Sequence, residues 1–132
     1  MLVKVEELIG PVLDWAVAKC EGQALLDPNN NEWEYCWNLL GDNSGDYYSP
    51  STNWEQGGPT LEKEGMQVFN CSKSSPEEPW FVEKNHFGRH HKAGRSYAQG
   101  PTILIAAMRC YVTSKLGDTV DIPDELFKGN KC

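Results

Sequence analysis

The segment from Pro101 to Leu116 carries the clearest structural signal in the chain. Proline is tolerated in the first turn of a helix, and Gly117 follows the segment as a terminating residue. A helix with one apolar face covers that face with other parts of the chain, so residues 101–116 predict a packed helix. Apolar side chains recur on or near one helical face at Ile103, Ala106, Ala107, Cys110 and Val112.

Two further helices are predicted ahead of this segment. Residues 11–21 carry apolar side chains at helical spacing, with a proline in the first turn and a glycine just beyond the end. Thr52 and Glu55 match a capping box, in which the two residues satisfy each other's backbone amides, so a helix should start there. The Gly-Gly-Pro sequence at 57–59 predicts that this helix is split or starts again at Pro59.

The β-prone runs determine the predicted fold class. Residues 66–71 and 80–83 predict a hairpin with a long polar loop, and residues 96–98 predict a third short strand. Alternating aromatic residues at 33–37 suggest another short strand, and residues 120–123 have the character of an extended tail. The chain is therefore expected to be α+β, with helices packed on a small antiparallel sheet in a single layer of strands.

Length and charge limit what such a fold can do. At 132 residues and 14.8 kDa, residues 1–132 form one expected domain, with 124–132 as a loose tail. The net charge of −7 argues against nonspecific binding to duplex DNA, where lysines and arginines must neutralise phosphates. The longest strongly apolar run, residues 103–108, is far below the roughly 20 residues that cross a bilayer. Acidic residues also interrupt the N-terminal apolar stretch, so we expect a cytoplasmic protein without membrane contact.

The five cysteines are odd in number and contain no Cys-x-x-Cys pair. Free thiols are the simplest interpretation, and Cys20 and Cys110 lie in helical patterns that favour the core. No spacing in the sequence completes a metal site or a cofactor motif. We therefore predict neither a metal nor a cofactor.

Residues 84–95, the basic window, concentrate the cationic chemistry of the chain. They hold all three histidines and four of the twelve lysines and arginines, without a carboxylate. Such a segment suits a phosphate or carboxylate ligand, and its glycines let backbone amides approach the ligand closely. Helix starts at residues 59–60 or 101–102 would add further amides. The candidate contacts within the window are His86, Arg89, His90, His91, Lys92 and Arg95.

Other interpretations of the basic window stay open. The window also fits a solvated loop whose charges keep it out of the core. His86 and His90 have i, i+4 spacing for a metal, but Gly88 weakens a helix there and no further ligands complete the site. His90 or His91 offers a general acid or base for a phosphoester, without a recognisable carboxylate partner. Binding of single-stranded nucleic acid is disfavoured by the net charge.

A second constellation, residues 47–54, sets aromatic rings beside hydroxyl and amide groups. Tyr48 and Trp54 offer planar faces for a base or sugar, while the basic window would hold phosphates. The alternative is a capped helix start with Trp54 in the core. Both interpretations can hold together, because the N-terminus of a capped helix is itself an anion site.

Three blocks of sequence carry a family resemblance. They read LDWAVAK at 13–19, YSPSTNW with QGGP at 48–59, and GPT through IAAMRCYV with SKLGD at 100–118. These blocks resemble the NinX proteins of lambdoid phages, and they follow the family's order over nearly the whole chain. The resemblance implies a small phage protein that acts inside an infected bacterium. The chain is also distantly similar to phage ABA-sandwich domains, with Asn53 where Asp is common and Ile103 where Pro is common.

Aromatic segments, a cationic window and the lack of a catalytic motif favour a binding protein over an enzyme. The expected function is that of a phage accessory counter-defence protein, which binds and sequesters a nucleotide-like, phosphate-bearing host signal. One alternative is an acidic inhibitor that docks on a host defence or regulatory protein, and another is a nucleotide-cleaving phosphodiesterase. The expected partner is an anionic small molecule or, under the first alternative, a host protein. A homo-oligomer is compatible with a sequestering role.

Overall fold

The three-stranded antiparallel sheet at the centre of the fold was expected from the sequence. Its strands are ordered β2 (Gln67–Asn70), β3 (Trp80–His86) and β4 (Gly94–Gly100), which confirms the hairpin and the third strand. The predicted strand at 33–37 and the tail at 124–132 lie outside the described residues. This computed structural model describes residues 1–21, 49–86 and 94–122.

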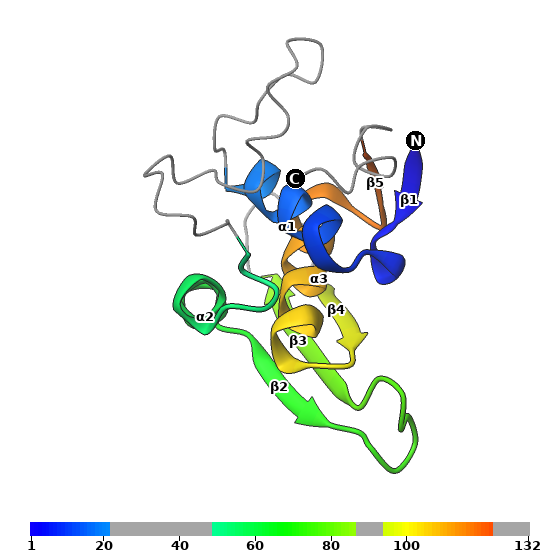
Figure 1. Cartoon of the computed structure of the whole chain (residues 1–132). Helices are drawn as coiled ribbons and strands as arrows, with labels where there is room; N and C mark the ends of the chain where they lie inside the picture. The colour runs from blue at the N-terminus through cyan, green and yellow to red at the C-terminus, as the bar shows by residue number, and fades with distance from the viewer. Residues whose placement is uncertain (22–48, 87–93, 123–132) are drawn as a thin grey trace, which may run out of the picture.

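The helices gather on the sheet and on one another (Figure 1). Helix α3 (Ile103–Leu116) packs across β3 and β4, while α1 (Gly10–Cys20) and α2 (Trp54–Lys63) contact α3. This arrangement confirms the α+β class. All residues of α3 from Leu104 to Val112 are buried, so the helix is covered on more sides than its single apolar stripe suggested.

One face of the sheet forms part of the core. The register places Val68, Val82 and Ala98 side by side, one residue from each strand. Val82 is fully buried, and the other two pack against the core. Because successive side chains of a strand point to opposite faces, the residues flanking this row belong to the other face of the sheet.

A second antiparallel sheet joins the two ends of the described chain. Strand β1 (Leu2–Lys4) pairs with β5 (Thr119–Asp121), and the amino group of Met1 donates to the Asp121 carboxylate at 2.8 Å. The extended character of the β5 segment was predicted, but its partner was not. The acidic turn after β1 is a 3-10 helix, η1 (Val5–Glu7). A three-residue strand is too short to show the alternation by which strands are recognised.

Helix α2 differs from its prediction in two respects. Its N-cap is Asn53 rather than Thr52, and the Asn53 side chain accepts from the Glu55 amide at 2.9 Å. The helix is also continuous through Pro59, so residues 59–60 are not a helix start. The residue before a proline resists helical geometry chiefly through its Cβ and N–H, and Gly58 has no Cβ. A glycine at this position therefore lets the helix pass through the proline.

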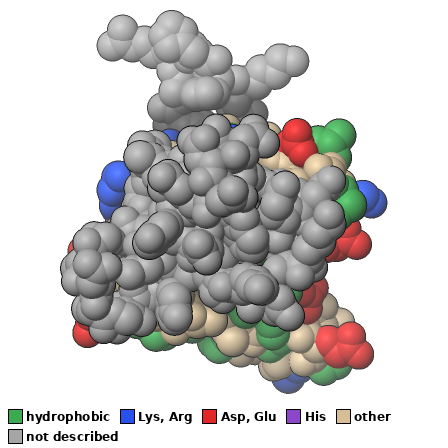
Figure 2. Space-filling view, turned by 45° about the horizontal axis from the view of Figure 1, so that its top comes forward, with side chains coloured by type: hydrophobic (Ala, Val, Ile, Leu, Met, Phe, Trp, Pro, Cys, Tyr) green, Lys and Arg blue, Asp and Glu red, His purple; other side chains and the backbone are tan. Residues whose placement is uncertain are grey.

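The cysteines of α1 and α3 lie in or against the core. Cys110 is buried and Cys20 half-buried against the core, both as free thiols, as predicted. Burial raises the pKa of each thiol to about 12, so neither is a nucleophile at neutral pH. In the described part of the surface visible in Figure 2, acidic and basic side chains are interspersed. No helix among the described residues has the length and apolar character needed to span a bilayer.

Candidate functional site

The predicted ligand contacts fall into two groups. Tyr48 and the four residues 89–92 lie outside the described residues, so their role stays a prediction. His86 is the last residue of β3 and Arg95 the second residue of β4. Because His86 pairs with Gly94, the described ends of the basic window lie together at one end of the β3–β4 hairpin.

Lys84, at the start of the basic window, has a structural partner. Its ammonium group forms an ion pair with Glu64 just beyond the end of α2, and both side chains are largely buried. Burial alone raises the pKa of Glu64, but the hydrogen bond and charge of Lys84 outweigh it and hold this pKa below its usual value. Lys84 therefore anchors α2 to β3.

Trp54 lies on the surface instead of in the core, so the interpretation of a buried tryptophan is wrong. It is the first residue of α2, and 56% of its surface is exposed. The side chain lines a pocket of about 360 Å³, which we call the tryptophan pocket. The sequence interpretation assigned Trp80 to a strand without a site role, yet it lines the same pocket. The remaining lining residues are Ser51, Thr52 and the five residues from Pro101 to Ile105.

The N-termini of two helices border the tryptophan pocket. Thr102 caps α3 by accepting from the Ile105 amide at 3.1 Å, so α3 begins two residues later than predicted. Helix geometry leaves the amides of Ile103 and Leu104 without intrahelical acceptors. Both residues line the pocket, and the start of α2 lies beside them. The pocket thus combines indole rings with the positive ends of two helix dipoles, which favours a planar ligand with an anionic group.

The tryptophan pocket and the described ends of the basic window lie at opposite ends of the same hairpin. Trp80 pairs with Gly100 at the pocket end, whereas His86 pairs with Gly94 at the other end. Six residue steps along the extended strand separate the two pairs, a distance of roughly 20 Å. The structure therefore brings Trp54 to the start of α3 and not to His86 or Arg95.

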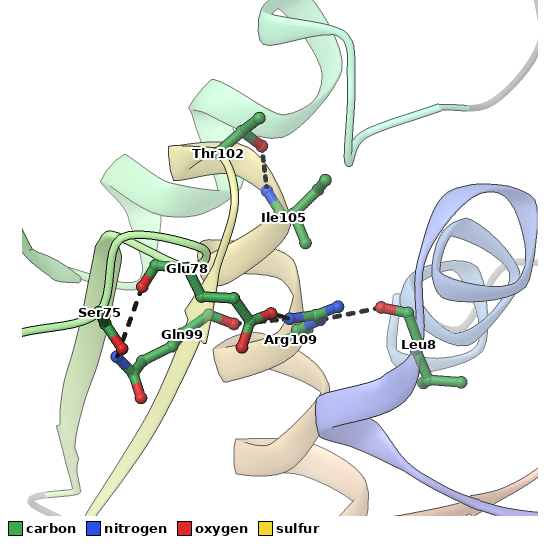
Figure 3. A network of polar contacts seen from close by, with 7 residues as sticks. All are labelled: Leu8, Ser75, Glu78, Gln99, Thr102, Ile105 and Arg109. Carbon is green, nitrogen blue, oxygen red and sulfur yellow. Dashed lines mark hydrogen bonds and ion pairs between the residues drawn. The ribbon is translucent and has the colours of Figure 1, made fainter. Parts of the chain in front are cut away.

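Arg109 holds the chain that enters the pocket from β4. Its Nε donates to the Leu8 carbonyl at 2.9 Å, and one terminal nitrogen lies 2.7 Å from both the Gln99 carbonyl and the Glu78 carboxylate (Figure 3). The adjoining Gly100 approaches α3 so closely that a Cβ would lie 2.8 Å from the Ala106 amide nitrogen. These contacts fix the turn that presents residues 101–105 to the pocket.

Asp14 holds the opposite wall of the pocket. This buried carboxylate of α1 accepts from the Ser51 amide at 2.8 Å and so fixes the turn before α2. Burial raises the pKa of Asp14 to about 6, although the hydrogen bond from the Ser51 amide partly offsets this effect. A carboxyl group with a raised pKa contributes stability below the unfolded value of 3.8, and that contribution is lost as the pH rises through about 6.

We expect Asp14→Asn to stabilise the protein at pH 7.5 by up to about 3 kcal/mol, because the amide keeps an acceptor for Ser51 without a buried charge. At pH 3, where the carboxyl group is protonated in both the folded and the unfolded protein, the two proteins should be nearly equal in stability. Urea unfolding at both pH values measures the difference. A variant that is less stable than the wild type by the same amount at both pH values would contradict this account.

The sequence of this chain matches a protein family over most of its length. Residues 4–115 match the family described as Bacteriophage P22, NinX. The chain belongs to the NinX family. The match includes α1, α2, the three-stranded sheet and nearly all of α3, so both walls of the tryptophan pocket lie inside the NinX region. No curated protein matches the chain.

Proposed function

We propose that this NinX protein is a phage accessory counter-defence protein that acts in the host cytoplasm by sequestering a small nucleotide-like ligand. The observation that carries this proposal is the tryptophan pocket at the joint N-termini of α2 and α3. Its volume of about 360 Å³ suits a small ligand of this kind.

In this proposal each part of the ligand has a separate role in the tryptophan pocket. The base of the nucleotide stacks on the indole of Trp54, and the phosphate of the nucleotide accepts hydrogen bonds from the backbone amides of Ile103 and Leu104. The described lining consists of indole rings, hydroxyls, amides and aliphatic groups. Such groups bind and orient a ligand, which is why we propose sequestration in preference to cleavage.

The basic window is a second proposed anion contact. A mononucleotide in the tryptophan pocket would not reach His86 or Arg95 across roughly 20 Å. The window residues therefore take either an extended ligand or a separate anion. Its proposed contacts remain Arg89, His90, His91, Lys92, Arg95 and His86, while Tyr48 stays a proposed stacking group beside Trp54.

Calorimetric titration with a panel of mono-, di- and cyclic nucleotides tests the pocket. For a ligand that binds the wild type, Trp54→Ala should weaken binding about tenfold or more, because base stacking contributes about 1–3 kcal/mol. Ile9→Ala is the matched control, since Ile9 is a similarly exposed apolar residue that does not line the pocket. If no nucleotide binds the wild type, the proposed function is wrong.

The same titration separates the alternatives for the basic window. An Arg89→Ala/Arg95→Ala variant should bind less tightly only those nucleotides that reach the basic window. Trp54→Ala should not show this selectivity. Mass analysis of the recovered ligand then distinguishes binding from turnover. An unchanged nucleotide supports sequestration, whereas a cleaved one would favour a phosphodiesterase that depends on His90 or His91.

A further inference from the structure

Three aromatic side chains form a row across the sheet face opposite Val82. Phe69 of β2 pairs in register with Phe81 of β3, and their ring centroids lie 6.1 Å apart. Phe81 stacks on Tyr97 of β4 with a centroid distance of 5.6 Å and an interplanar angle of 20°. The row is continuous across all three strands, and we call it the aromatic row.

The aromatic row is open to solvent. Phe69 is 46% exposed and Tyr97 56% exposed, while α3 covers the other face of the sheet around Val82. Isolated apolar residues are common on surfaces, but a connected row of aromatic rings marks a contact surface. It shares no residue with the tryptophan pocket, so its role is independent of nucleotide binding.

Acidic residues lie near the Tyr97 end of the aromatic row. Glu83 pairs in register with Tyr97, which places its carboxylate on the same face of the sheet. Tyr97 also lines a second pocket, of about 470 Å³, with Lys4, Glu6 and Asp118. Glu78 lines this acidic pocket too, and Arg109 neutralises it at 2.7 Å. The remaining charged residues of the acidic pocket, Lys4, Glu6 and Asp118, together carry a net negative charge.

Aromatic rings beside carboxylates select a planar cation. A guanidinium group stacks on aromatic faces and accepts carboxylates as partners, and it is weakly hydrated compared with an ammonium group. Nucleic acid is disfavoured, since its phosphates would meet Glu83 and a chain of net charge −7. A second copy of the chain would bring the same acidic surface against itself. The charge complementarity therefore points to a basic protein.

We propose that the aromatic row and the acidic pocket together dock an arginine-bearing segment of a partner protein. One arginine enters the acidic pocket beside Tyr97, and neighbouring residues of the segment lie along Phe81 and Phe69. This gives the acidic NinX chain a defined protein-binding surface that is separate from the tryptophan pocket.

Fluorescence anisotropy with labelled nonapeptides of alternating arginine and glycine tests this surface. Tyr97→Ala should weaken binding of the arginine peptide about three- to tenfold, the range expected for loss of a cation–π contact. Tyr97→Phe keeps the ring and should bind within about twofold of the wild type. Neutralising the pocket with Glu6→Gln and Asp118→Asn should also weaken binding. The matched control, Glu55→Gln with Glu62→Gln, removes the same charge from exposed positions on α2.

The outcomes distinguish a specific docking surface from nonspecific charge attraction, nucleic-acid binding and self-association. Equal weakening by the α2 control would show that net charge alone attracts the peptide and would overturn the proposal. Tighter binding of a single-stranded oligonucleotide would assign the row to nucleic acid, and a dimer lost in Tyr97→Ala by sedimentation would assign it to self-association. Failure of nucleotide titrations leaves this test unaffected, and circular dichroism of each variant verifies that it is folded.

Discussion

Gly57→Ala is expected to destabilise the protein strongly, although alanine is the better helix former. A Cβ on Gly57 would collide with the backbone oxygen of Pro50 and lie 2.9 Å from Cδ2 of Leu104. A backbone oxygen in a packed turn cannot swing aside as the end of a flexible side chain can, so α2 would have to move. We expect the free energy of unfolding to fall by at least ~3 kcal/mol, measured by urea denaturation.

Gly58→Ala provides the matched control for this effect. A Cβ on Gly58 meets only Cε3 of Trp54, at an ordinary contact distance of 3.5 Å. Better helix propensity and the clash with the following proline act in opposite directions, so stability should stay within about 1 kcal/mol of the wild type. If Gly57→Ala were as stable as Gly58→Ala, the close approach of α2 to Pro50 and Leu104 would be contradicted. Because Leu104 also lines the tryptophan pocket, Gly57→Ala should impair nucleotide binding as well.

The features that could be predicted from the sequence are those with local signals. Helix α1 has a proline in its first turn and apolar residues at helical spacing, and both act within a few residues. The β2–β3 hairpin has two β-prone runs around a polar loop. These signals do not require knowledge of the rest of the fold, so the α+β class followed from them.

Most of the features that were missed depend on distant partners. Strand β1 is defined only by its pairing with β5, more than a hundred residues later in the chain. The passage of α2 through Pro59 is eased by the absence of a Cβ at Gly58, a local effect that helix scales do not include. The burial of α3 on several sides arises because the sheet, α1 and α2 all contact it. Propensity describes none of these long-range contacts.

In the candidate site, too, the locally encoded features were predicted and the long-range ones were missed. Trp54 and the helix start near residue 102 were recognised locally, as an aromatic group and as a proline in the first turn of a helix. Their common pocket was not, because it requires Trp80 to pair with Gly100 so that the end of β4 turns into α3 beside α2. The same register carries the basic window to the far end of the hairpin. The pairing register of β3 with β4 thus decides that Trp54 can share a ligand with the start of α3 and not with the described ends of the basic window.

Arg109 connects this register to the N-terminal half of the protein. The guanidinium group is buried, and its three acceptors come from Leu8 before α1, Gln99 in β4 and Glu78 in the β2–β3 loop. Gln99 adds a weaker link to the same loop through Ser75 at 3.3 Å. One arginine therefore holds three segments that the chain brings together from distant positions. The planar fork of arginine suits this role, since lysine has a single nitrogen for the same acceptors.

Arg109→Met is expected to reduce the free energy of unfolding by about 3–5 kcal/mol, since it strips buried acceptors of their donor. Arg109→Lys should lose less, because it keeps the charge but cannot reach all three acceptors. Glu78→Gln should cost about 1 kcal/mol or less, as the Glu78 side chain is 44% exposed and the amide can still accept. Urea unfolding gives this order directly. A methionine variant as stable as the glutamine variant would show that the ion pair alone matters, whereas the expected order places the stabilisation in the buried carbonyls of Leu8 and Gln99.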